Sequence, residues 1–141
     1  MLPVPVPLES SIVDLFGLET WMDAYVLAWA TNQPEAVADL FAEDARYYTH
    51  PFREPWSGRE AIVSKWLDHP DPSGSWKASY RPLAVSGNTG VVRGTTQYFK
   101  EDGSKDTEYA NIFVIEFDET GQATEFTEFF MESNPQPRVS S

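Results

Sequence analysis

The order of the periodic patterns along the chain constrains the fold more than any other feature of the sequence. Helical spacing of apolar residues is confined to the first half, whereas the second half contains four β-prone segments, at about residues 76–86, 91–100, 108–117 and 123–132. Turn-forming sequences that contain glycine separate these segments, which is typical of an antiparallel meander. We therefore predict an α+β fold in which three helices from the N-terminal half cover one face of a curved antiparallel sheet.

Local sequence signals indicate where the helices begin and end. Thr20 and Asp23 have the spacing of a capping box, so the first helix is expected to begin near Thr20. Pro34 suits the first position of a second helix, and a third lies between a second capping box at residues 57–60 and a stop at His69. The inward positions of the first two helices are expected to be Trp21, Tyr25, Ala28, Trp29, Val37, Leu40 and Phe41.

The charge balance excludes several classes of partner. The chain carries 10 Lys and Arg against 22 Asp and Glu, which gives a net charge of −12. Such an acidic surface repels phosphate backbones and anionic lipid, so neither nucleic acid nor a membrane is expected as a partner. Cysteine is absent, which excludes a disulfide framework and a thiol nucleophile.

Both ends of the sequence contain closely spaced prolines. We expect residues 1–16 to form an extended Pro-rich arm, residues 17–133 a single domain and residues 134–141 a flexible tail. No Lys or Arg precedes Arg46, unlike in a secretory signal, and the longest apolar run, residues 24–30, is far shorter than the roughly 20 residues that span a bilayer. A cytoplasmic location is therefore expected.

Alternation along the β-prone segments assigns side chains to two faces of the sheet. One face is expected to combine polar and aromatic residues, namely Arg93, Thr95, Gln97, Phe99, Tyr109, Asn111, Phe113, Phe126, Glu128 and Phe130. The other is expected to be largely apolar, with Val92, Tyr98, Ile112, Val114, Phe129 and Met131. This division predicts a ligand pocket on the first face and a protein partner on the second.

The familiar motifs of cofactor and metal chemistry are missing from the sequence. It contains no G-x-S-x-G, G-x-x-x-x-G-K-[ST] or G-x-G-x-x-G motif, and His50 and His69 lie outside any zinc-type spacing. We therefore expect neither a metal nor another cofactor. Polar groups among aromatic residues are suited instead to moving protons on a bound organic molecule.

Two residues are candidates for the group that moves the proton. His50 has the side chain whose ordinary pKa, near ~6.5, allows proton exchange at neutral pH, although a solvated loop histidine fits the sequence as well. Glu128 lies between Phe126 and Phe130, where loss of water would raise its pKa unless a cation such as Arg93 pairs with it. An Arg93–Glu128 pair fits either a structural ion pair or a ligand-binding site.

Further residues are candidates for substrate contacts. The Tyr25 phenol can donate a hydrogen bond to an oxyanion, but a tyrosine at this helical position also fits the core. Asn111 needs hydrogen-bond partners if it is buried, and a ligand carbonyl could be one of them. The other expected contacts are Trp29, Trp56, Trp66, Gln97, Tyr109 and Phe113.

Several short motifs follow one another between residues 17 and 132. A helical segment, a break and an F-A-x-D-A ending occupy residues 25–45, followed by HPF at 50–52, SGRE at 57–60, FDETG at 117–121 and FTEFF at 126–130. Their order and spacing resemble the NTF2-like superfamily, in particular its SnoaL-like and ketosteroid-isomerase-like branch. The resemblance implies a cone of curved sheet, closed by three helices around a pocket.

The resemblance also implies roles for individual residues. Tyr25 falls where ketosteroid isomerases keep an oxyanion-hole tyrosine, and His50 falls near their catalytic aspartate, with one extra residue. Phe113 replaces their second oxyanion donor, a protonated aspartate. Glu128 resembles the acidic base that SnoaL-like polyketide cyclases carry on the last strand. In the mechanism that we expect from these roles, Arg93 would tune this base or bind an acidic substituent.

These observations lead to two functional hypotheses. The first is a SnoaL-like, cofactor-independent isomerase, cyclase or dehydratase that transfers a proton next to a carbonyl of a small hydrophobic or aromatic ligand. The second is a non-catalytic NTF2-like domain for ligand binding or assembly. The apolar face of the sheet predicts a homodimer, because monomeric proteins seldom expose such a patch, and the resemblance implies the same since many relatives dimerise through this surface. The alternative is that the Pro-rich N-terminal arm or the C-terminal tail folds over this face, which would need no second chain.

Overall fold

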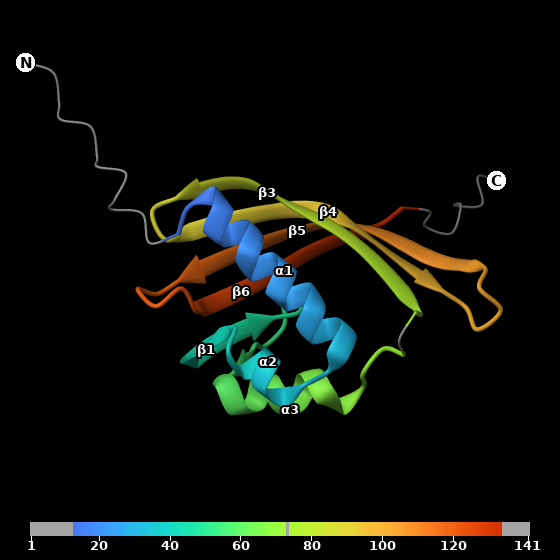
Figure 1. Ribbon diagram of the computed structural model, residues 1–141, viewed down its shortest axis with the longest axis horizontal. Coiled ribbons are helices and arrows are strands. Elements are labelled where there is room, and N and C mark those ends of the chain that lie inside the picture. The colour runs from blue at the N-terminus through green and yellow to red at the C-terminus, as the bar shows by residue number, and fades with distance from the viewer. Residues whose placement is uncertain (1–12, 73, 134–141) are drawn as a thin grey trace, which may run out of the picture.

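The computed structural model describes residues 13–72 and 74–133 (Figure 1), so residues 1–12 of the expected arm and the expected tail at 134–141 lie outside the described residues. The elements in chain order are α1 (Leu15–Thr31), α2 (Pro34–Ala38), β1 (Phe41–Tyr48), β2 (Trp56–Ser57), α3 (Arg59–Asp68), β3 (Trp76–Ser86), β4 (Thr89–Phe99), β5 (Lys105–Phe117) and β6 (Ala123–Glu132). The four long strands agree with the β-prone segments of the sequence to within three residues, which confirms the α+β prediction.

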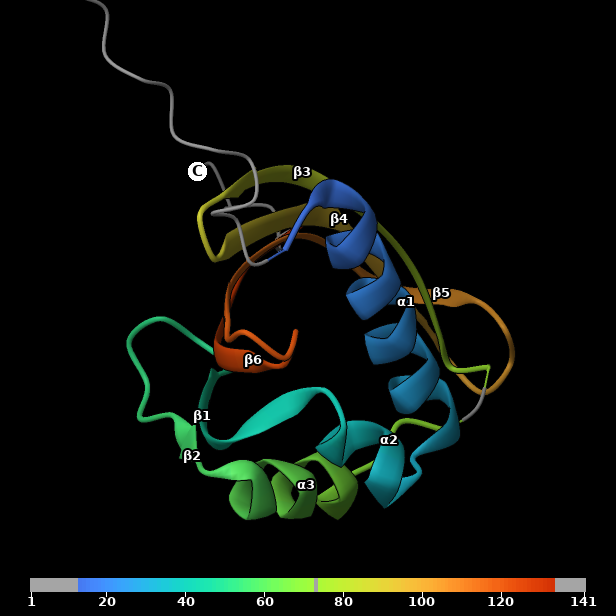
Figure 2. The ribbon, with the colours of Figure 1, turned by 60° about the vertical axis from the view of Figure 1, so that its left-hand side comes forward.

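The described strands form one curved sheet in the order β2-β1-β6-β5-β4-β3. Strands β3 to β6 form the expected antiparallel meander, but β1 pairs with β6 in parallel. A parallel pair needs a long crossover connection, which is provided here by α3 and the strands β3 to β5. Figure 2 shows α1 along one side of the curved sheet and α2 and α3 below it, so the helices and the sheet surround the interior of a cone.

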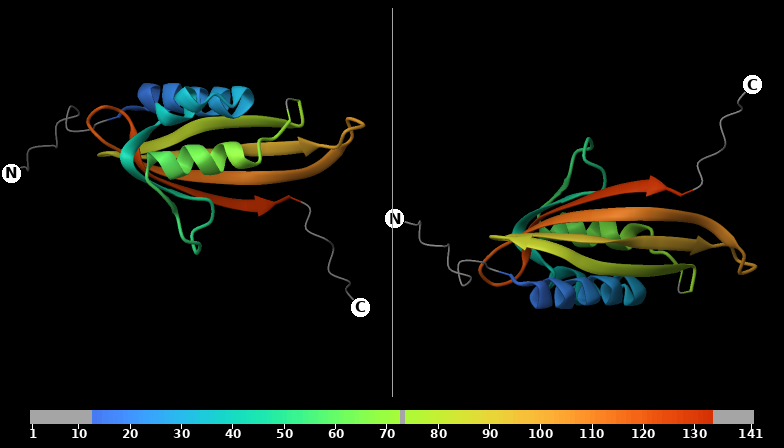
Figure 3. Two further views of the ribbon diagram at one scale, coloured as in Figure 1. Left: turned by 90° about the horizontal axis from the view of Figure 1, so that it is seen from below. Right: turned by 90° about the horizontal axis from the view of Figure 1, so that it is seen from above.

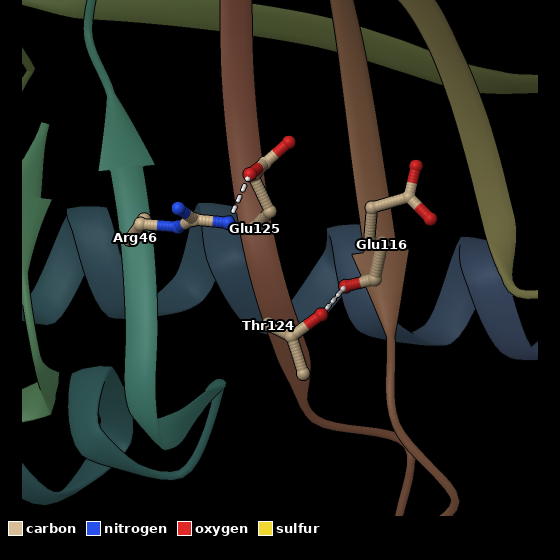
Figure 4. A network of polar contacts seen from close by, with 4 residues as sticks. All are labelled: Arg46, Glu116, Thr124 and Glu125. Carbon is tan, nitrogen blue, oxygen red and sulfur yellow. Dashed lines mark hydrogen bonds and ion pairs between the residues drawn. The ribbon is translucent and has the colours of Figure 1, made fainter.

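An exposed ion pair joins β1 to β6. Arg46 Nη2 donates to Glu125 Oε1 over 3.0 Å, and the two residues are register partners (Figure 4). Close by, Thr124 Oγ1 on β6 donates to the carbonyl oxygen of Glu116 on β5 over 3.3 Å. The Arg46 side chain is 56% exposed, so the ion pair contributes at most about 1 kcal/mol. Backbone pairing and the aromatic core therefore hold β1 in the sheet.

Helix α1 begins earlier than the capping-box pattern predicts. Its N-cap is Asp14, whose side chain accepts a hydrogen bond from the backbone N–H of Gly17 over 2.7 Å. Thr20 lies inside the helix, and its hydroxyl donates to the carbonyl oxygen of Phe16. The start predicted at Thr20 is thus wrong, because Leu15 and Phe16 are exposed and hide the first turn from an apolar periodicity.

The segment after Pro34 becomes a strand sooner than expected. Pro34 opens α2 as predicted, but this helix ends at Ala38 and Phe41 begins β1. The Phe41 side chain is fully buried, and its backbone pairs with Ala123 of β6. The helical spacing of the apolar residues after Pro34 is too short to determine the structure, and burial of the Phe41 ring against the sheet makes this residue part of a strand.

Helix α3 starts at a different residue from the one predicted, but it ends where predicted. Its N-cap is Gly58, which has a φ of 92° and donates its backbone N–H to Ala45. No side chain caps this helix, so the second capping box is not formed. The helix ends at Asp68, directly before His69, as predicted.

The register of β4 reverses the faces that the sequence predicted for this strand. Arg93 lies opposite Ile112 of β5, and cross-strand partners share a face, so Arg93 and Gln97 lie on the outer face. Val92 is fully buried in the core and Tyr98 lines the interior. The predictions for these four residues, and for Thr95, which is exposed on the outer face, are wrong, because burying apolar side chains and keeping polar ones in water outweighs any clustering of polar groups around a ligand.

The outer face of the long strands is not covered by any described helix, as Figure 3 shows. Ile112 and Phe129 are register partners on this face, as are Ala110 and Met131. Phe129 is 43% exposed and Met131 is 75% exposed. The outer positions expected for Ile112, Val114, Phe129 and Met131 agree with the register. Among the described helices, none is both long and apolar enough to cross a membrane.

Candidate functional site

A cavity of about 560 Å³ lies between the helices and the inner face of the sheet. Nine residues that the sequence predicted for the site line it, namely Tyr25, Trp29, Trp56, Trp66, Tyr109, Asn111, Phe113, Glu128 and Phe130. The structure therefore gathers residues from α1, β2, α3, β5 and β6 around one interior space. Cavities of this size hold small organic ligands.

Four predicted site residues do not line this cavity. Arg93 and Gln97 are on the outer face of the sheet, as the register of β4 requires. Phe126 is fully buried beneath the cavity wall. His50 follows the end of β1, where its ring lies 6.2 Å from that of Phe130 and its Nδ1 accepts the backbone N–H of Phe52 over 3.2 Å.

Sequence reasoning missed about half of the cavity lining. The residues that it did not include are Asn32, Tyr47, Lys65, His69, Pro70, Asp71, Tyr80, Thr96 and Tyr98. Simple alternation of apolar and polar residues along β4 would have identified Tyr98, because it shares a face with the buried Val92. The loop residues and Lys65 have no comparable pattern, since only the tertiary fold brings them to the cavity.

Two carboxyl groups line the cavity, those of Asp71 and Glu128, and the pKa of Glu128 is raised. Loss of water on burial raises its pKa to about 7, and a hydrogen bond from Asn111 lowers the pKa against this effect. None of the ion pairs among the described residues includes Glu128. The predicted pairing with Arg93 is wrong because the two side chains lie on opposite faces of the sheet. Desolvation without a cation thus dominates the ionisation of Glu128.

Glu128 is connected to three polar residues on neighbouring strands. Asn111 Nδ2 on β5 donates to Glu128 Oε2 over 2.9 Å. Thr96 Oγ1 on β4 donates to Asn111 Oδ1 over 2.8 Å, and the Tyr80 hydroxyl on β3 bonds to Thr96 Oγ1. The partner expected for Asn111, a ligand carbonyl, is therefore replaced by protein groups.

A pair of phenols lies on the other side of the cavity lining, on α1 and β1. The hydroxyls of Tyr25 and Tyr47 are 2.7 Å apart. Burial, above all, raises the pKa of both tyrosines well above the usual value, and the negative charge of Glu128 raises it further. Both phenols therefore stay protonated at neutral pH. One hydroxyl proton is used between them, which leaves the other free to be donated to a ligand oxygen.

Aromatic rings and a few polar groups surround the remaining part of the cavity. Trp29 stacks on Trp76 with ring centroids 3.6 Å apart, and its Nε1 donates to Asp71 over 2.9 Å. Asn32, in the left-handed C-cap of α1, has a buried Oδ1 without a hydrogen-bond partner. No group of three or more His, Cys, Asp or Glu side chains among residues 13–72 and 74–133 is arranged to hold a metal ion.

The sequence of residues 22–126 matches the family model described as the SnoaL-like domain. The chain belongs to the SnoaL-like domain family. This family is part of the NTF2-like superfamily, in agreement with the resemblance of the short motifs. The region matched by the SnoaL-like model includes Tyr25 and Asn111 and ends two residues before Glu128.

A solved structure has the same fold as this SnoaL-like domain. It is the crystal structure of an uncharacterized protein with a cystatin-like fold from Caulobacter vibrioides. The two sequences are 17% identical, the likeness covers 84% of this chain and 90% of that one, and the TM-score is 0.61. A likeness at this identity concerns the fold alone. The search of curated proteins finds no match.

The raised pKa of Glu128 predicts a pH dependence of stability. A carboxyl group whose pKa rises on folding stabilises the folded state below its unfolded pKa, and this contribution is lost as the pH rises from about 4.5 to about 7. We expect the free energy of unfolding of Glu128→Gln at pH 8 to exceed that of the wild type by on the order of 2–3 kcal/mol, measured by denaturant unfolding. The difference should vanish at pH 4.

The matched control for this measurement is Glu119→Gln, on the exposed turn between β5 and β6. Its effect on the unfolding free energy should be small and independent of pH. A Glu128→Gln variant that is equally destabilised at pH 4 and pH 8 would show that Glu128 is ordinary in its ionisation.

Proposed function

We propose that this SnoaL-like domain is a cofactor-independent enzyme that transfers a proton at the carbon next to a carbonyl of a small organic substrate. The observation that carries the proposal is Glu128, a carboxyl group in an aromatic cavity with a pKa near 7 and no ion-pair partner among the described residues. A general base is most effective when its pKa lies close to the working pH. Isomerases, cyclases and dehydratases of carbonyl compounds all begin with this proton transfer.

In the proposed mechanism, ionised Glu128 removes a proton from the carbon beside the carbonyl. The electron pair of the broken C–H bond moves to the carbonyl oxygen, and the phenol pair of Tyr25 and Tyr47 donates a hydrogen bond to the resulting enolate. A well-placed donor of this kind contributes roughly 2.7–4 kcal/mol to catalysis. The enolate then takes the proton back at another carbon, attacks a second carbonyl or expels a β-hydroxyl group.

The geometry favours Glu128 over His50 as the base. Glu128 lines the cavity together with the phenol pair, whereas His50 is absent from the residues that line it. The Nδ1 atom of His50 accepts the backbone N–H of Phe52, which occupies the ring atom that would otherwise accept a proton. We therefore assign His50 to the loop after β1 and not to proton transfer.

The cavity lining indicates the class of substrate. Aromatic rings of Trp29, Trp66, Phe113 and Phe130 form much of the wall, and the volume of about 560 Å³ suits a molecule of one to a few rings. Phe113 packs at 4.9 Å from the ring of Tyr80. Phe113 offers no hydrogen-bond donor, and we assign the carbonyl oxygen to the phenol pair of Tyr25 and Tyr47. We propose a small hydrophobic or aromatic carbonyl compound.

The alternative is a SnoaL-like domain that binds a ligand without changing it. It differs from the enzyme in one measurable respect. A binding domain would retain a ligand equally well with Glu128 or Gln at position 128 and would not exchange any ligand hydrogen with solvent. The burial of an ionisable group at Glu128 without an ion-pair partner among the described residues favours the enzyme, because an apolar side chain would serve a purely binding wall better.

Exchange of hydrogen for deuterium tests the proposed proton transfer without knowledge of the natural substrate. A panel of aryl and cyclic ketones is incubated with the protein in D₂O, and deuterium at the carbon next to the carbonyl is followed by NMR. Glu128→Gln should lower the exchange rate of the best compound by about 10²–10⁴-fold, the usual effect of losing a general base. Tyr25→Phe should lower it by about 10²–10³-fold, the effect of losing an oxyanion donor.

Two variants serve as controls for this experiment. Glu119→Gln and Tyr48→Phe make the same chemical changes at residues that do not line the cavity, so they should exchange at the wild-type rate. Equal exchange in wild type and Glu128→Gln, with a panel compound shown to bind, would contradict the proposed base and support the binding domain.

We also propose that two copies of the chain pair through the outer face of the sheet. Like charges lie opposite each other there, with Arg81 beside Arg93 and Glu116 beside Glu125. Such pairs destabilise a sheet. Glu125 is already ion-paired with an arginine of β1, whereas Arg81 and Arg93 have no ion-pair partner among the described residues. A second copy related by a two-fold axis would let acidic side chains of one copy meet these arginines of the other, and it would cover the exposed side chains of the outer face such as Phe129.

Light scattering at micromolar concentration tests the homodimer. The wild type should have twice the single-chain mass of 15.9 kDa, and Ile112→Glu with Val114→Glu should reduce it to 15.9 kDa by burying charges in the interface. Leu27→Glu with Ala30→Glu, on the exposed side of α1, should leave the dimer intact. A wild-type mass of 15.9 kDa would overturn the dimer.

A further inference from the structure

The hydrogen bonds around Glu128 form a chain across four neighbouring strands. It runs from the Tyr80 hydroxyl on β3 to Thr96 on β4, to the Asn111 amide on β5 and to Glu128 Oε2 on β6. Thr96 and Asn111 are each only 3% exposed and are the polar side chains counted as buried among the described residues. Buried polar groups cost free energy unless they are satisfied, and the hydrogen bonds of this series give both Thr96 and Asn111 partners.

The chemistry of the groups permits one order of donors when Glu128 is ionised. A carboxylate only accepts, so Asn111 must direct its NH₂ group toward Glu128 and its Oδ1 away. The Oδ1 atom accepts, so Thr96 must donate to it. Thr96 has a single hydroxyl proton, and Tyr80 must therefore donate to Thr96. The ionised Glu128 therefore leaves a single consistent arrangement of donors along Asn111, Thr96 and Tyr80, in which Thr96 and Tyr80 supply the protons that satisfy Asn111 Oδ1 and Thr96 Oγ1.

The packing of β3 on β4 depends on a glycine at this point. A Cβ atom on Gly94 would lie 2.5 Å from Tyr80 Cδ1 and 2.1 Å from the carbonyl oxygen of Ser79. Any larger residue would therefore displace Tyr80 from its place across β4. The absence of a side chain at Gly94 lets the Tyr80 ring lie over the strand and reach Thr96, two residues along.

We propose that Thr96 and Tyr80 are positioning residues, which lock the Asn111 amide so that it holds Glu128 through Oε2 and leaves Oε1 to exchange the proton with the substrate. This inference rests on the proposed function of Glu128 as the base. In the reaction the substrate C–H bond breaks, an O–H bond forms at Oε1, and the electron pair moves into the substrate carbonyl. Thr96 and Tyr80 act through Asn111.

The lock has a consequence for the ionisation of Glu128. A donated N–H favours the carboxylate and lowers its pKa, whereas a turned amide would present Oδ1, which favours the protonated acid. The hydrogen bonds from Tyr80 to Glu128 therefore keep a fraction of the Glu128 carboxyl groups ionised at neutral pH despite their burial. Other titratable groups that face Glu128 or line the same cavity are Tyr25, Tyr47, Lys65, His69, Asp71, Tyr98 and Tyr109.

Replacing Thr96 by Val tests the lock at a distance from the base. Val has nearly the same shape but no hydroxyl, so Asn111 loses its donor and is free to turn. We expect the pKa of Glu128 to rise by about 1 or more, as follows from the strength of a hydrogen bond to a charged group. The measurement is an NMR titration of ¹³C-labelled glutamate carboxyl carbons, in which the Glu128 signal is identified by its loss in Glu128→Gln.

Thr95→Val is the matched control, because Thr95 is the neighbouring residue of the same strand and is exposed on the outer face. It should leave the pKa of Glu128 at the wild-type value. Tyr80→Phe removes the far end of the chain and should raise the pKa in the same direction by less than Thr96→Val. If Thr96→Val does not fold, Tyr80→Phe decides the question by itself.

Two outcomes separate this inference from the proposed function. A wild-type pKa near 7 that is unchanged in Thr96→Val, or in Tyr80→Phe where the former does not fold, overturns the lock and leaves the base in place. A wild-type pKa near the ordinary 4.5 contradicts Glu128 as a neutral-pH base, and the lock then has no role in catalysis.

Discussion

The stacking of Phe126 between two tyrosines is the interaction on which the rest of the structure depends. Its ring lies 5.3 Å from that of Tyr25 on α1 and 4.5 Å from that of Tyr47 on β1, in nearly parallel planes. The stack joins the first helix and the parallel edge strand to β6. Because Glu128 follows Phe126 by two residues on the same face of β6, the stack also places the carboxyl group in the cavity and brings the two phenols close to it.

The chemistry of the cavity follows from desolvation more than from charge pairing. The chain has a net charge of −12, and its arginines at positions 81 and 93 face outward, so no described cation is ion-paired with the Glu128 carboxylate. Burial therefore raises its pKa toward neutrality, and Asn111 limits the rise. A SnoaL-like cone is suited to this arrangement, because three helices and a curved sheet exclude water from an interior that still admits a ligand.

The strands of the second half agree well with the sequence-based prediction because turn-forming residues mark their ends. Gly87, Gly103 and Gly121 each have a positive φ in a tight turn, and glycine marks such positions in a sequence. The sequence predicts the wrong faces for β4 if its polar side chains, such as Arg93 and Gln97, are expected to contact a ligand. Alternation along the strand places both on the face opposite the buried Val92, where they are in contact with water. The hydrogen bonds that Tyr47 and Tyr80 make at the cavity could not be predicted. Their partners are 22 and 16 residues away in the sequence and come close only in the folded protein.

The pH dependence of proton exchange tests the central claim most directly. Wild-type protein should exchange the hydrogen next to the carbonyl of a bound ketone at a rate that rises with pH and levels off above an apparent pKa near 7, since in the proposed mechanism only ionised Glu128 acts as the base. A profile that levels off near pH 4.5, or one that is the same in Glu128→Gln as in the wild type, would contradict the account.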